Sequence, residues 1–494
     1  MIPFGEYLPD QPLFQNPGAT VALNVVPLTT QSYGPFATLL PYTAAMATRC
    51  KGAITAKDVD GDISYFAGIA AAINHLKSDQ TWEDYSKSGG YALGAEDFWY
   101  FLQYGNRIVA VSNSNPIQTF LLGTDIIFSD LSATAPQAAY ASIIRDFLMV
   151  GNTYFSGDTV PNMVWWSAID DPTSWPAVGS TAAIEVQSDN QQLPEGGAVQ
   201  GIVGSIGGAD GAVFMEEAIY RITYVGSPVI FQFDRVEKQH GTRIPGSIVN
   251  VGNFAFYLGV DGFYAFDGTN STPIGAQKVD KSFYKDFDQN NFFNVVSAAD
   301  VINKQVMWAY PGVGNSNGVP NKMLVYNWIT NRWTLVEQEI EYFFRAYTQG
   351  YTLDQLDAFG TIDTLPYSLD SRIWAGGTIL LSGFDSAHKL GNFAGDNLAA
   401  TIETADIDSQ GGQRVFVSGI RPIVDTSGVT AAVGYRDNLS DPVSYTTPTS
   451  PGSDAYCPQR ISRRFVRAQV NIAAAASWTH AQGIETIQQP AGER

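Results

Sequence analysis

The stretch QHGTRIPGSIVNVGNFAFYLGVDGFYAFDGTNSTPIGAQKVDKSF, residues 239–283, decides the predicted fold. Its apolar residues recur at a period of two, which is typical of half-buried strands. Two pairs, Asp261-Gly262 and Asp267-Gly268, separate the apolar runs, and Asp-Gly accepts the backbone angles of tight hairpin turns. Four short antiparallel strands in about 35 residues make one blade of a β-propeller. The predicted strands are 248–251, 254–258, 263–266 and 271–274.

Units of the same form recur along most of the chain. Each contains paired apolar runs separated by Gly, Asn or Asp, at a period of roughly 40–50 residues. Such units predict a ring, because each propeller blade covers the face of its neighbour. We expect an all-β protein with a β-propeller of roughly six to seven blades over residues 46–395, and two unrelated β-sandwiches are the competing arrangement. The units are 54–85, 98–128, 143–175, 200–233, 239–283, 295–336 and, as a candidate seventh, 343–381.

The two ends of the chain differ from this middle part. Residues 1–45 carry seven prolines interleaved with large apolar residues such as Phe4, Tyr7 and Phe14. Proline disfavours helix at its own position and at the residue before it. We expect an extended arm that lies along the body of the protein or along a neighbouring subunit, with a disordered tail as the alternative. Residues 396–494 hold strand-like runs between polar loops and predict a C-terminal β-sandwich domain.

Composition supports an all-β protein and limits the classes of partner that the protein can bind. The chain has 494 residues with 47 Gly, 25 Pro and only 15% charged residues, so it is rich in turns and poor in solvated helix faces. A net charge of −20 repels nucleic acid and anionic membranes at long range. Two cysteines, Cys50 and Cys457, do not indicate a disulfide-stapled secreted fold. With no signal peptide or membrane-spanning run, we expect a soluble protein made in the cytoplasm.

Motifs that carry chemistry are missing or incomplete in the sequence. The acidic run at 58–62 resembles the start of a calcium loop, but Ile63 and Ile69 occupy the positions of the turn glycine and the bidentate acid. The four histidines are far apart and lack the spacing of metal ligands. No nucleophile elbow, phosphate loop or dinucleotide fingerprint is present. The sequence therefore predicts a protein that is not an enzyme, with no catalytic residue, metal or cofactor.

Four arginines form the one basic feature of this acidic chain. Arg460, Arg463, Arg464 and Arg467 lie in the run RISRRFVRAQVNI, which we interpret as a single strand. On that strand Arg463 and Arg467 share one face, and Arg460 and Arg464 share the other. Either the strand is an exposed sheet edge whose charges prevent pairing with other strands, or it contacts an acidic partner or a phosphate. Because acidic groups are in excess, we favour a protein interface over nucleic acid.

The opening stretch resembles a known family, the packaged-DNA stabilisation or tail hub (nozzle) proteins of short-tailed bacteriophages. The basic run followed by an apolar strand near the C-terminus, and the start Pro-Phe-Gly-Glu-Tyr-Leu-Pro-Asp, are also similar to proteins of this kind. The matching motifs indicate a propeller blade rather than an active site. They are His240-Gly241, Ile244–Ser247, Phe254–Gly259, Asp261–Tyr264, Gly268, Pro273-Ile274 and Val279–Lys281.

The resemblance implies a place in the virion tail. Family members form a six-fold ring below the portal and its adaptor, line the DNA exit channel, retain the packaged genome and carry tail fibres or a needle. It therefore implies a homo-hexamer made in the host cytoplasm, with the head-to-tail connector as a partner and no membrane insertion by this chain. Double-stranded DNA would pass without sequence-specific binding. An acidic channel wall fits this role, because it repels the phosphates of a sliding duplex.

One other function stays open on the sequence. A carbohydrate-binding or glycoside-hydrolase β-propeller is compatible with the same repeated units. Such an enzyme needs two carboxylates on either side of one sugar site. Acidic residues are plentiful in this chain, but nothing in their spacing selects such a pair.

Overall fold

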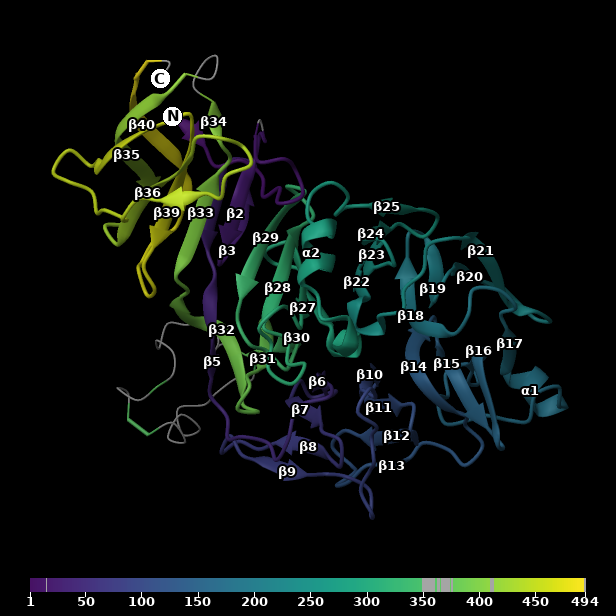
Figure 1. Cartoon of the computed structure of the whole chain (residues 1–494). Helices are drawn as coiled ribbons and strands as arrows, with labels where there is room; N and C mark the ends of the chain where they lie inside the picture. The colour runs from purple at the N-terminus through teal and green to yellow at the C-terminus, as the bar shows by residue number, and fades with distance from the viewer. Residues whose placement is uncertain are drawn as a thin grey trace.

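The computed structural model describes residues 1–14, 16–348, 360, 361, 365, 374, 376–408 and 413–492. Part of the predicted unit 343–381 lies outside these residues. The described chain is built almost entirely from strands, as the sequence predicts (Figure 1). Its helical elements are short, and they are α1 (Thr181–Val186), α2 (Asp280–Asp286), η1 (Pro245–Ser247) and η2 (Gln289–Asn294).

Consecutive strands pair antiparallel in rows of four across the middle of the chain. Five of these rows are separate four-stranded sheets made of neighbouring strands, and the row β26–β29 opens a larger sheet. The rows are β6 (Ala53–Lys57), β7 (Ile63–Gly68), β8 (Ile73–Leu76), β9 (Trp82–Asp84); β10 (Tyr100–Tyr104), β11 (Arg107–Ser112), β12 (Asn115–Leu121), β13 (Ser129–Asp130); β14 (Gln137–Ile144), β15 (Phe147–Phe155), β16 (Asp158–Trp166), β17 (Asp189–Gln192); β18 (Val199–Ile206), β19 (Ala209–Met215), β20 (Ile219–Gly226), β21 (Ile230–Glu237); β22 (Val249–Val251), β23 (Phe254–Leu258), β24 (Phe263–Phe266), β25 (Ser271–Pro273); and β26 (Val296–Asp300), β27 (Gln305–Tyr310), β28 (Lys322–Asn327), β29 (Arg332–Glu337).

A further four-stranded sheet joins the two ends of the chain. It contains β30 (Tyr342–Tyr347), β31 (Ile379–Phe384) and β32 (Leu390–Asn397), and its fourth strand is β5 (Ala37–Pro41) from the N-terminal segment. Strand β5 runs antiparallel to β32, with Leu39 opposite Phe393.

The rows follow one another around a closed cycle (Figure 1). The first strand of each row contacts a strand of the next row, in the order β6, β10, β14, β18, β22, β26 and β30. The cycle closes because β30 in turn contacts β6. This all-β arrangement of small four-stranded sheets is consistent with a β-propeller-like fold.

The remaining strands form two larger sheets that contain both ends of the chain. One continues from β29 through β2 to β33, β39, β36 and β37, with β34 paired to β39, and the other has the order β3-β4-β40-β35-β38, with β1 paired to β40. Residues 1–45 therefore supply five strands. The bounds are β1 (Ile2–Pro3), β2 (Ala19–Leu23), β3 (Val25–Thr29), β4 (Ser32–Pro35), β33 (Ala400–Thr404), β34 (Ile407–Asp408), β35 (Val415–Val424), β36 (Val429–Arg436), β37 (Ser444–Tyr445), β38 (Cys457–Arg463), β39 (Phe465–Ile472) and β40 (Ala481–Pro490).

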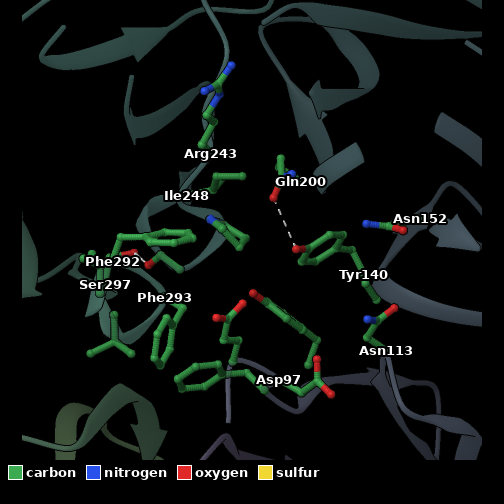
Figure 2. Close-up of a pocket in the computed structure, with 18 of the residues that line it drawn as sticks. Asp97, Asn113, Tyr140, Asn152, Gln200, Arg243, Ile248, Phe292, Phe293 and Ser297 are labelled. Atoms are coloured by element: carbon green, nitrogen blue, oxygen red, sulfur yellow. Dashed lines mark hydrogen bonds between the residues drawn. The ribbon is translucent and has the colours of Figure 1, made fainter. Parts of the chain in front are cut away.

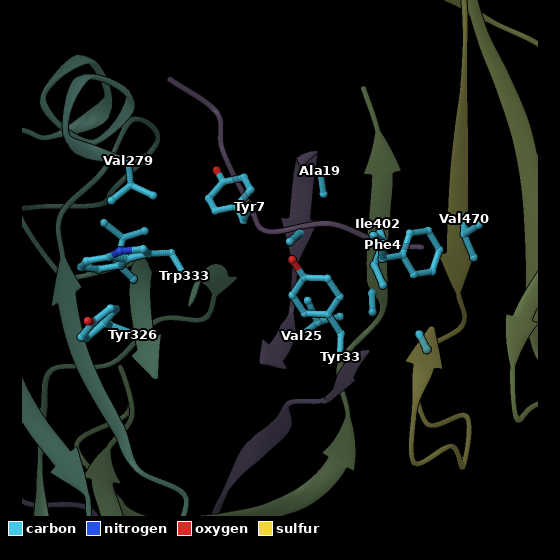
Figure 3. Packing of buried hydrophobic residues seen from close by; sticks show 14 of the residues in the cluster. Phe4, Tyr7, Ala19, Val25, Tyr33, Val279, Tyr326, Trp333, Ile402 and Val470 are labelled. Carbon is cyan, nitrogen blue, oxygen red and sulfur yellow. The ribbon is translucent and has the colours of Figure 1, made fainter. Parts of the chain in front are cut away.

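The largest apolar cluster runs from the ring of sheets into the two larger sheets. Figure 3 shows Phe4 and Tyr33 of the N-terminal segment between Trp333 on one side and Val470 on the other. All four side chains are buried. The N-terminal segment is thus the packing layer between the two parts of the molecule.

A buried arginine fixes this segment in place. The Arg332 guanidinium donates to the carbonyl oxygens of Thr29 at 2.8 Å and Gly5 at 2.5 Å, and it stacks on the Tyr33 ring at 4.3 Å from the ring centroid. The Tyr33 hydroxyl donates to the same Gly5 carbonyl at 2.7 Å. Such charge-assisted bonds in a buried site hold the backbone of the segment in one conformation.

The stretch that decides the fold forms the row β22–β25 and continues into α2. Asp261 and Gly262 lie in the turn between β23 and β24, and Asp267 and Gly268 lie in the turn between β24 and β25. Gly268 has a φ of +91°, in the left-handed region that favours glycine. Gly262 also has a positive φ, +158°, a backbone conformation that residues with a Cβ rarely adopt, as the Asp-Gly pair predicts.

Close packing is a second reason for the glycine at 262. A Cβ atom at this position would lie 2.2 Å from Oδ2 of Asp280, the first residue of α2. Asp280 Oδ1 accepts a hydrogen bond from the backbone N–H of Phe263 at 3.2 Å. The turn and the helix are therefore in direct contact, and only glycine fits between them.

We predict that Gly262→Val lowers the free energy of unfolding by roughly 1–3 kcal/mol, because the side chain is forced into the Asp280 carboxylate. Chemical denaturation monitored by tryptophan fluorescence measures this change. Gly419→Ala is the control, since a Cβ at Gly419 meets its neighbours only at 3.5 Å or more. Equal stability of Gly262→Val and the wild-type chain would contradict the contact.

We also predict a pH dependence from Asp280. Burial first, and then the nearby charges of Asp10 and Asp261, raise the pKa of its carboxyl to about 6, against the opposing effect of the hydrogen bond from the Phe263 N–H. The folded state therefore binds this proton more tightly than the unfolded state, and the resulting stabilisation is present below about pH 4 and lost as the pH rises through 6. From pH 4 to pH 7 the stability of the wild type relative to Asp280→Asn should fall by roughly 1–3 kcal/mol. A difference between the wild type and Asp280→Asn that does not change with pH would contradict the shift.

Candidate functional site

A cavity of about 510 Å³ lies where the first strands of the rows converge (Figure 2). Its size is in the range of small-molecule sites. The strands β10, β14, β15, β18, β26 and β30 each contribute lining residues, and the loops before β10, between β11 and β12, after β19, and before β22 and β26 contribute the rest. The residues used below are Glu96, Asp97, Tyr100, Asn113, Tyr140, Gln200, Glu216, Arg243, Phe292, Phe293 and Ser297.

A half-buried lysine, Lys51, shapes the acidic loop at one end of the cavity. Nζ of Lys51 donates to the carbonyl oxygens of Gly94 at 2.9 Å, Ala95 at 2.8 Å and Asp97 at 2.9 Å. Burial lowers the pKa of this ammonium group. Asp97 in turn accepts from the Gly94 N–H at 3.1 Å and from the Ser114 hydroxyl, so its carboxylate is held in one orientation.

A line of three polar side chains crosses the opposite wall. The Tyr140 hydroxyl donates to Oε1 of Gln200 at 3.4 Å, and Nε2 of Gln200 donates to Oε1 of Glu216 at 3.5 Å (Figure 2). Burial raises the pKa of Tyr140, and the charges of Asp97 and Glu216 raise it further. The hydroxyl therefore stays protonated and serves as a donor at any ordinary pH.

Aromatic rings meet at right angles on two sides of the cavity. The rings of Tyr100 and Tyr140 are 5.1 Å apart between centroids, at 73°. The rings of Phe292 and Phe293, from η2, are 5.9 Å apart at 80°. Each pair presents one ring face and one ring edge, which is a favourable aromatic geometry and leaves a concave corner.

Two polar groups of the lining are engaged by neighbouring residues. Ser297 donates its hydroxyl to the Gly246 carbonyl at 2.6 Å, so its proton faces no general base. Arg243 donates to Glu217 at 2.9 Å. In the part of the chain that the structure describes, no group of three or more acidic, histidine or cysteine side chains could hold a metal ion.

The candidate site residues predicted from the sequence do not line this cavity, although Pro245 and Gly246 of the matching motif Ile244–Ser247 do. Asp261, Gly262, Asp267 and Gly268 shape the two turns of the row β22–β25, and Tyr264 donates its hydroxyl to Asp261 at 2.9 Å. Their role in the structure is to form hairpins, as the Asp-Gly pairs predict.

The prediction of one arginine strand is wrong. Strand β38 ends at Arg463, the chain bends at Arg464, and β39 begins at Phe465 in the other large sheet. Arg460 and Arg464 are exposed, whereas Arg467 is buried. The bend lets the four arginines point into different surroundings.

Arg467 belongs to an ion-pair network within the chain, which corrects its assignment to an interface. Its guanidinium donates to Glu403 at 2.9 Å and to Asp406 at 2.8 Å, and Arg436 also pairs with Asp406. Glu403 accepts a further bond from the Tyr445 hydroxyl at 2.9 Å. Buried charges persist in a fold when they are paired in this way.

Arg463 also has partners within the chain. It lies 3.7 Å from Asp437 and stacks at 5.1 Å on the Tyr435 ring. In the described residues, Arg460 and Arg464 make no ion pair and no side-chain hydrogen bond. Only these two of the four arginines are available to another molecule.

Sequence reasoning missed the cavity because its residues come from distant loops. Glu96-Asp97, Gln200, Glu216 and Phe292-Phe293 share no short-range spacing. The usable signal is the position of these residues in the chain. Most of the lining residues lie at the beginning or the end of a predicted strand, on the side that faces the ring axis. That signal becomes visible only once the closed cycle is known.

No protein-family model matches the chain, and no curated protein matches it in sequence. Several solved structures are similar in shape, with low identity. The computationally designed Ika8 protein is 9% identical over 72% of this chain and 99% of its own, with a TM-score of 0.34. The Neurospora crassa Pan2 WD40 domain is 7% identical over 63% of this chain and 89% of its own, with a TM-score of 0.37. A functionally unknown protein from Desulfotomaculum acetoxidans is 10% identical over 64% of this chain and 98% of its own, with a TM-score of 0.35.

These scores are too low to carry an argument, and the fold described above rests on strand pairing. Among the described residues, none of the helices has the length and apolar character needed to cross a bilayer.

We predict that Arg467→Met lowers the free energy of unfolding by about 3–5 kcal/mol, because it leaves the buried Glu403 carboxylate without a cationic partner and leaves Asp406 paired with Arg436 alone. Arg464→Met is the matched control and should change stability by about 0.5 kcal/mol or less, since its side chain is exposed. Urea denaturation of the two variants measures the difference. Equal stability of both variants would mean that the network does not stabilise the fold.

Proposed function

We propose that the chain is a structural protein of a short-tailed phage tail, a ring-forming hub or nozzle. The ring would lie below the portal and its adaptor, line the DNA exit channel and retain the packaged genome. The motif residues that carry the resemblance support this proposal, because most of them lie in one compact unit. His240, Asp261–Tyr264 and Asp280 surround the same turn, where His240 stacks at 4.9 Å on Tyr264.

We further interpret the architecture as a seven-bladed propeller with a C-terminal β-sandwich. The seven blades are the rows described above, with β5 as the last strand of the seventh blade. The sandwich would consist of the sheet half β2-β33-β39-β36 packed on the sheet β4-β40-β35-β38. Packing between β35 and β36, and between β36 and β38, supports this pairing of faces.

The observation that carries the proposal is an uncovered basic edge on an acidic molecule. Strand β38 is the last strand in the order of its sheet, and Arg460 and Arg464 are exposed at that strand and just beyond it. The chain carries a net charge of −20, so another copy offers an acidic face. A basic edge that meets a different, acidic surface of the next copy makes a head-to-tail contact, and such contacts generate rings.

The DNA path would then lie between copies and not through one chain. One turn of duplex is about 34 Å long, and a cavity of about 510 Å³ cannot hold it. In a ring the wall of the channel would be built from acidic subunit surfaces. Such a wall lets the phosphates slide without the counterion-releasing contacts that bind DNA tightly.

The remaining partners follow from the same proposal. The ring would be a homo-hexamer that contacts the connector protein above and tail fibres or a needle below. It would have no catalytic activity and no cofactor. Turnover of a polysaccharide that is lost on replacing one carboxylate would contradict this part and favour the glycosidase alternative.

We predict that the purified protein forms closed rings, visible by native mass spectrometry and negative-stain microscopy. Arg460→Gln/Arg464→Gln should weaken the ring and make its stability less sensitive to salt than that of the wild type, because the variant lacks the exposed ion pairs that salt screens. Lys57→Gln/Lys281→Gln removes the same charge from exposed positions elsewhere and is the control. A protein that stays monomeric at all concentrations, or rings unaffected by the arginine variant, would contradict the proposed contact.

A further inference from the structure

We propose that the central cavity binds a small organic cation, with an ammonium group of the primary or quaternary class seated between its aromatic corners. This site is independent of ring formation, because all of its residues come from one chain. Three properties of the cavity support it, which are charge, aromatic geometry and fixed polar groups.

The lining is acidic. Glu96, Asp97 and Glu216 bring three carboxylates to the cavity, against the single guanidinium of Arg243. Arg243 is already paired with Glu217, 2.9 Å away. Carboxylates that line a low-dielectric cleft concentrate the field inside it, so a cation is attracted and an anion such as phosphate is repelled.

The aromatic corners provide the second element of a cation site. The perpendicular pairs Tyr100/Tyr140 and Phe292/Phe293 lie on different walls of the cavity (Figure 2). Ring faces attract cations through their quadrupole, and cages of several rings are used to recognise quaternary ammonium groups. The protein already uses this interaction nearby, because Nζ of Lys51 lies 5.3 Å from the centroid of the Phe98 ring.

The polar groups are fixed before any ligand arrives. Lys51 holds the 94–97 loop through three carbonyl oxygens, and the Ser114 hydroxyl orients Asp97. On the other wall, Gln200 is held between Tyr140 and Glu216. Because these groups need no reordering, little conformational entropy is lost when a ligand binds.

A neutral sugar is the competing ligand, since it also uses amides, carboxylates and rings. It would gain nothing from the excess of negative charge. The two ligand classes therefore differ in one measurable way, which is their dependence on ligand charge.

The experiment uses choline and its neutral isostere 3,3-dimethylbutan-1-ol with the full chain, measured by isothermal titration calorimetry. We expect choline to bind and the isostere to bind at least about tenfold more weakly, which corresponds to about 1.4 kcal/mol. Asp97→Asn and Glu216→Gln should each weaken choline binding about tenfold. Tyr140→Phe, which keeps the ring, should bind better than Tyr140→Leu, which removes it.

Asp158→Asn is the control, because Asp158 is an exposed carboxylate at the start of β16. Circular dichroism melting of every variant separates loss of binding from loss of folding. Equal binding of choline and its isostere, binding of uncharged monosaccharides with no response to the carboxylate variants, or no choline binding up to about 50 mM would each overturn the proposal. None of these outcomes bears on ring formation, so the two proposals fail separately.

Discussion

The structure depends on one pairing between distant parts of the chain, the antiparallel contact of β5 with β32. Without β5 the sheet of β30 would have three strands and a free edge at β32. The central cavity depends on closure of the cycle of sheets, which the contact between β30 and β6 completes. Tyr342 of β30 and Tyr100 of β10 both line it, although they come from rows that meet only because the cycle is closed.

The N-terminal segment does more than supply β5 to the sheet of β30. Its strand β2 lies between β29 and β33 and joins the last complete row to the C-terminal strands in one sheet. Arg332 holds its backbone from the inner side, and Phe4 and Tyr33 fill the space between the two parts. Relative movement of the two parts would break backbone pairing and open a dry core, so we expect them to move as one body.

The sequence predicted what is encoded locally. Alternating apolar residues and the pairs Asp261-Gly262 and Asp267-Gly268 placed the strands and turns of β22–β25 well, because hairpins need only near neighbours. The run Arg460–Arg467 was misinterpreted as one strand. Its two halves pair into two different sheets, and this separation sets the bend at Arg464. The cavity escaped prediction for a similar reason. Tyr140 and Glu216 become neighbours of Asp97 only through the order of the rows.

The pairing of β5 with β32 also determines when the protein can finish folding. During synthesis β5 leaves the ribosome long before β32, and at typical rates of 5–20 residues per second it waits for roughly tens of seconds. An unpaired strand invites wrong partners over that time. Prolines at 3, 27, 35 and 41 lie within strands of this segment and remove backbone donors. The composition of the N-terminal segment therefore protects the nascent chain until its own C-terminal strands arrive.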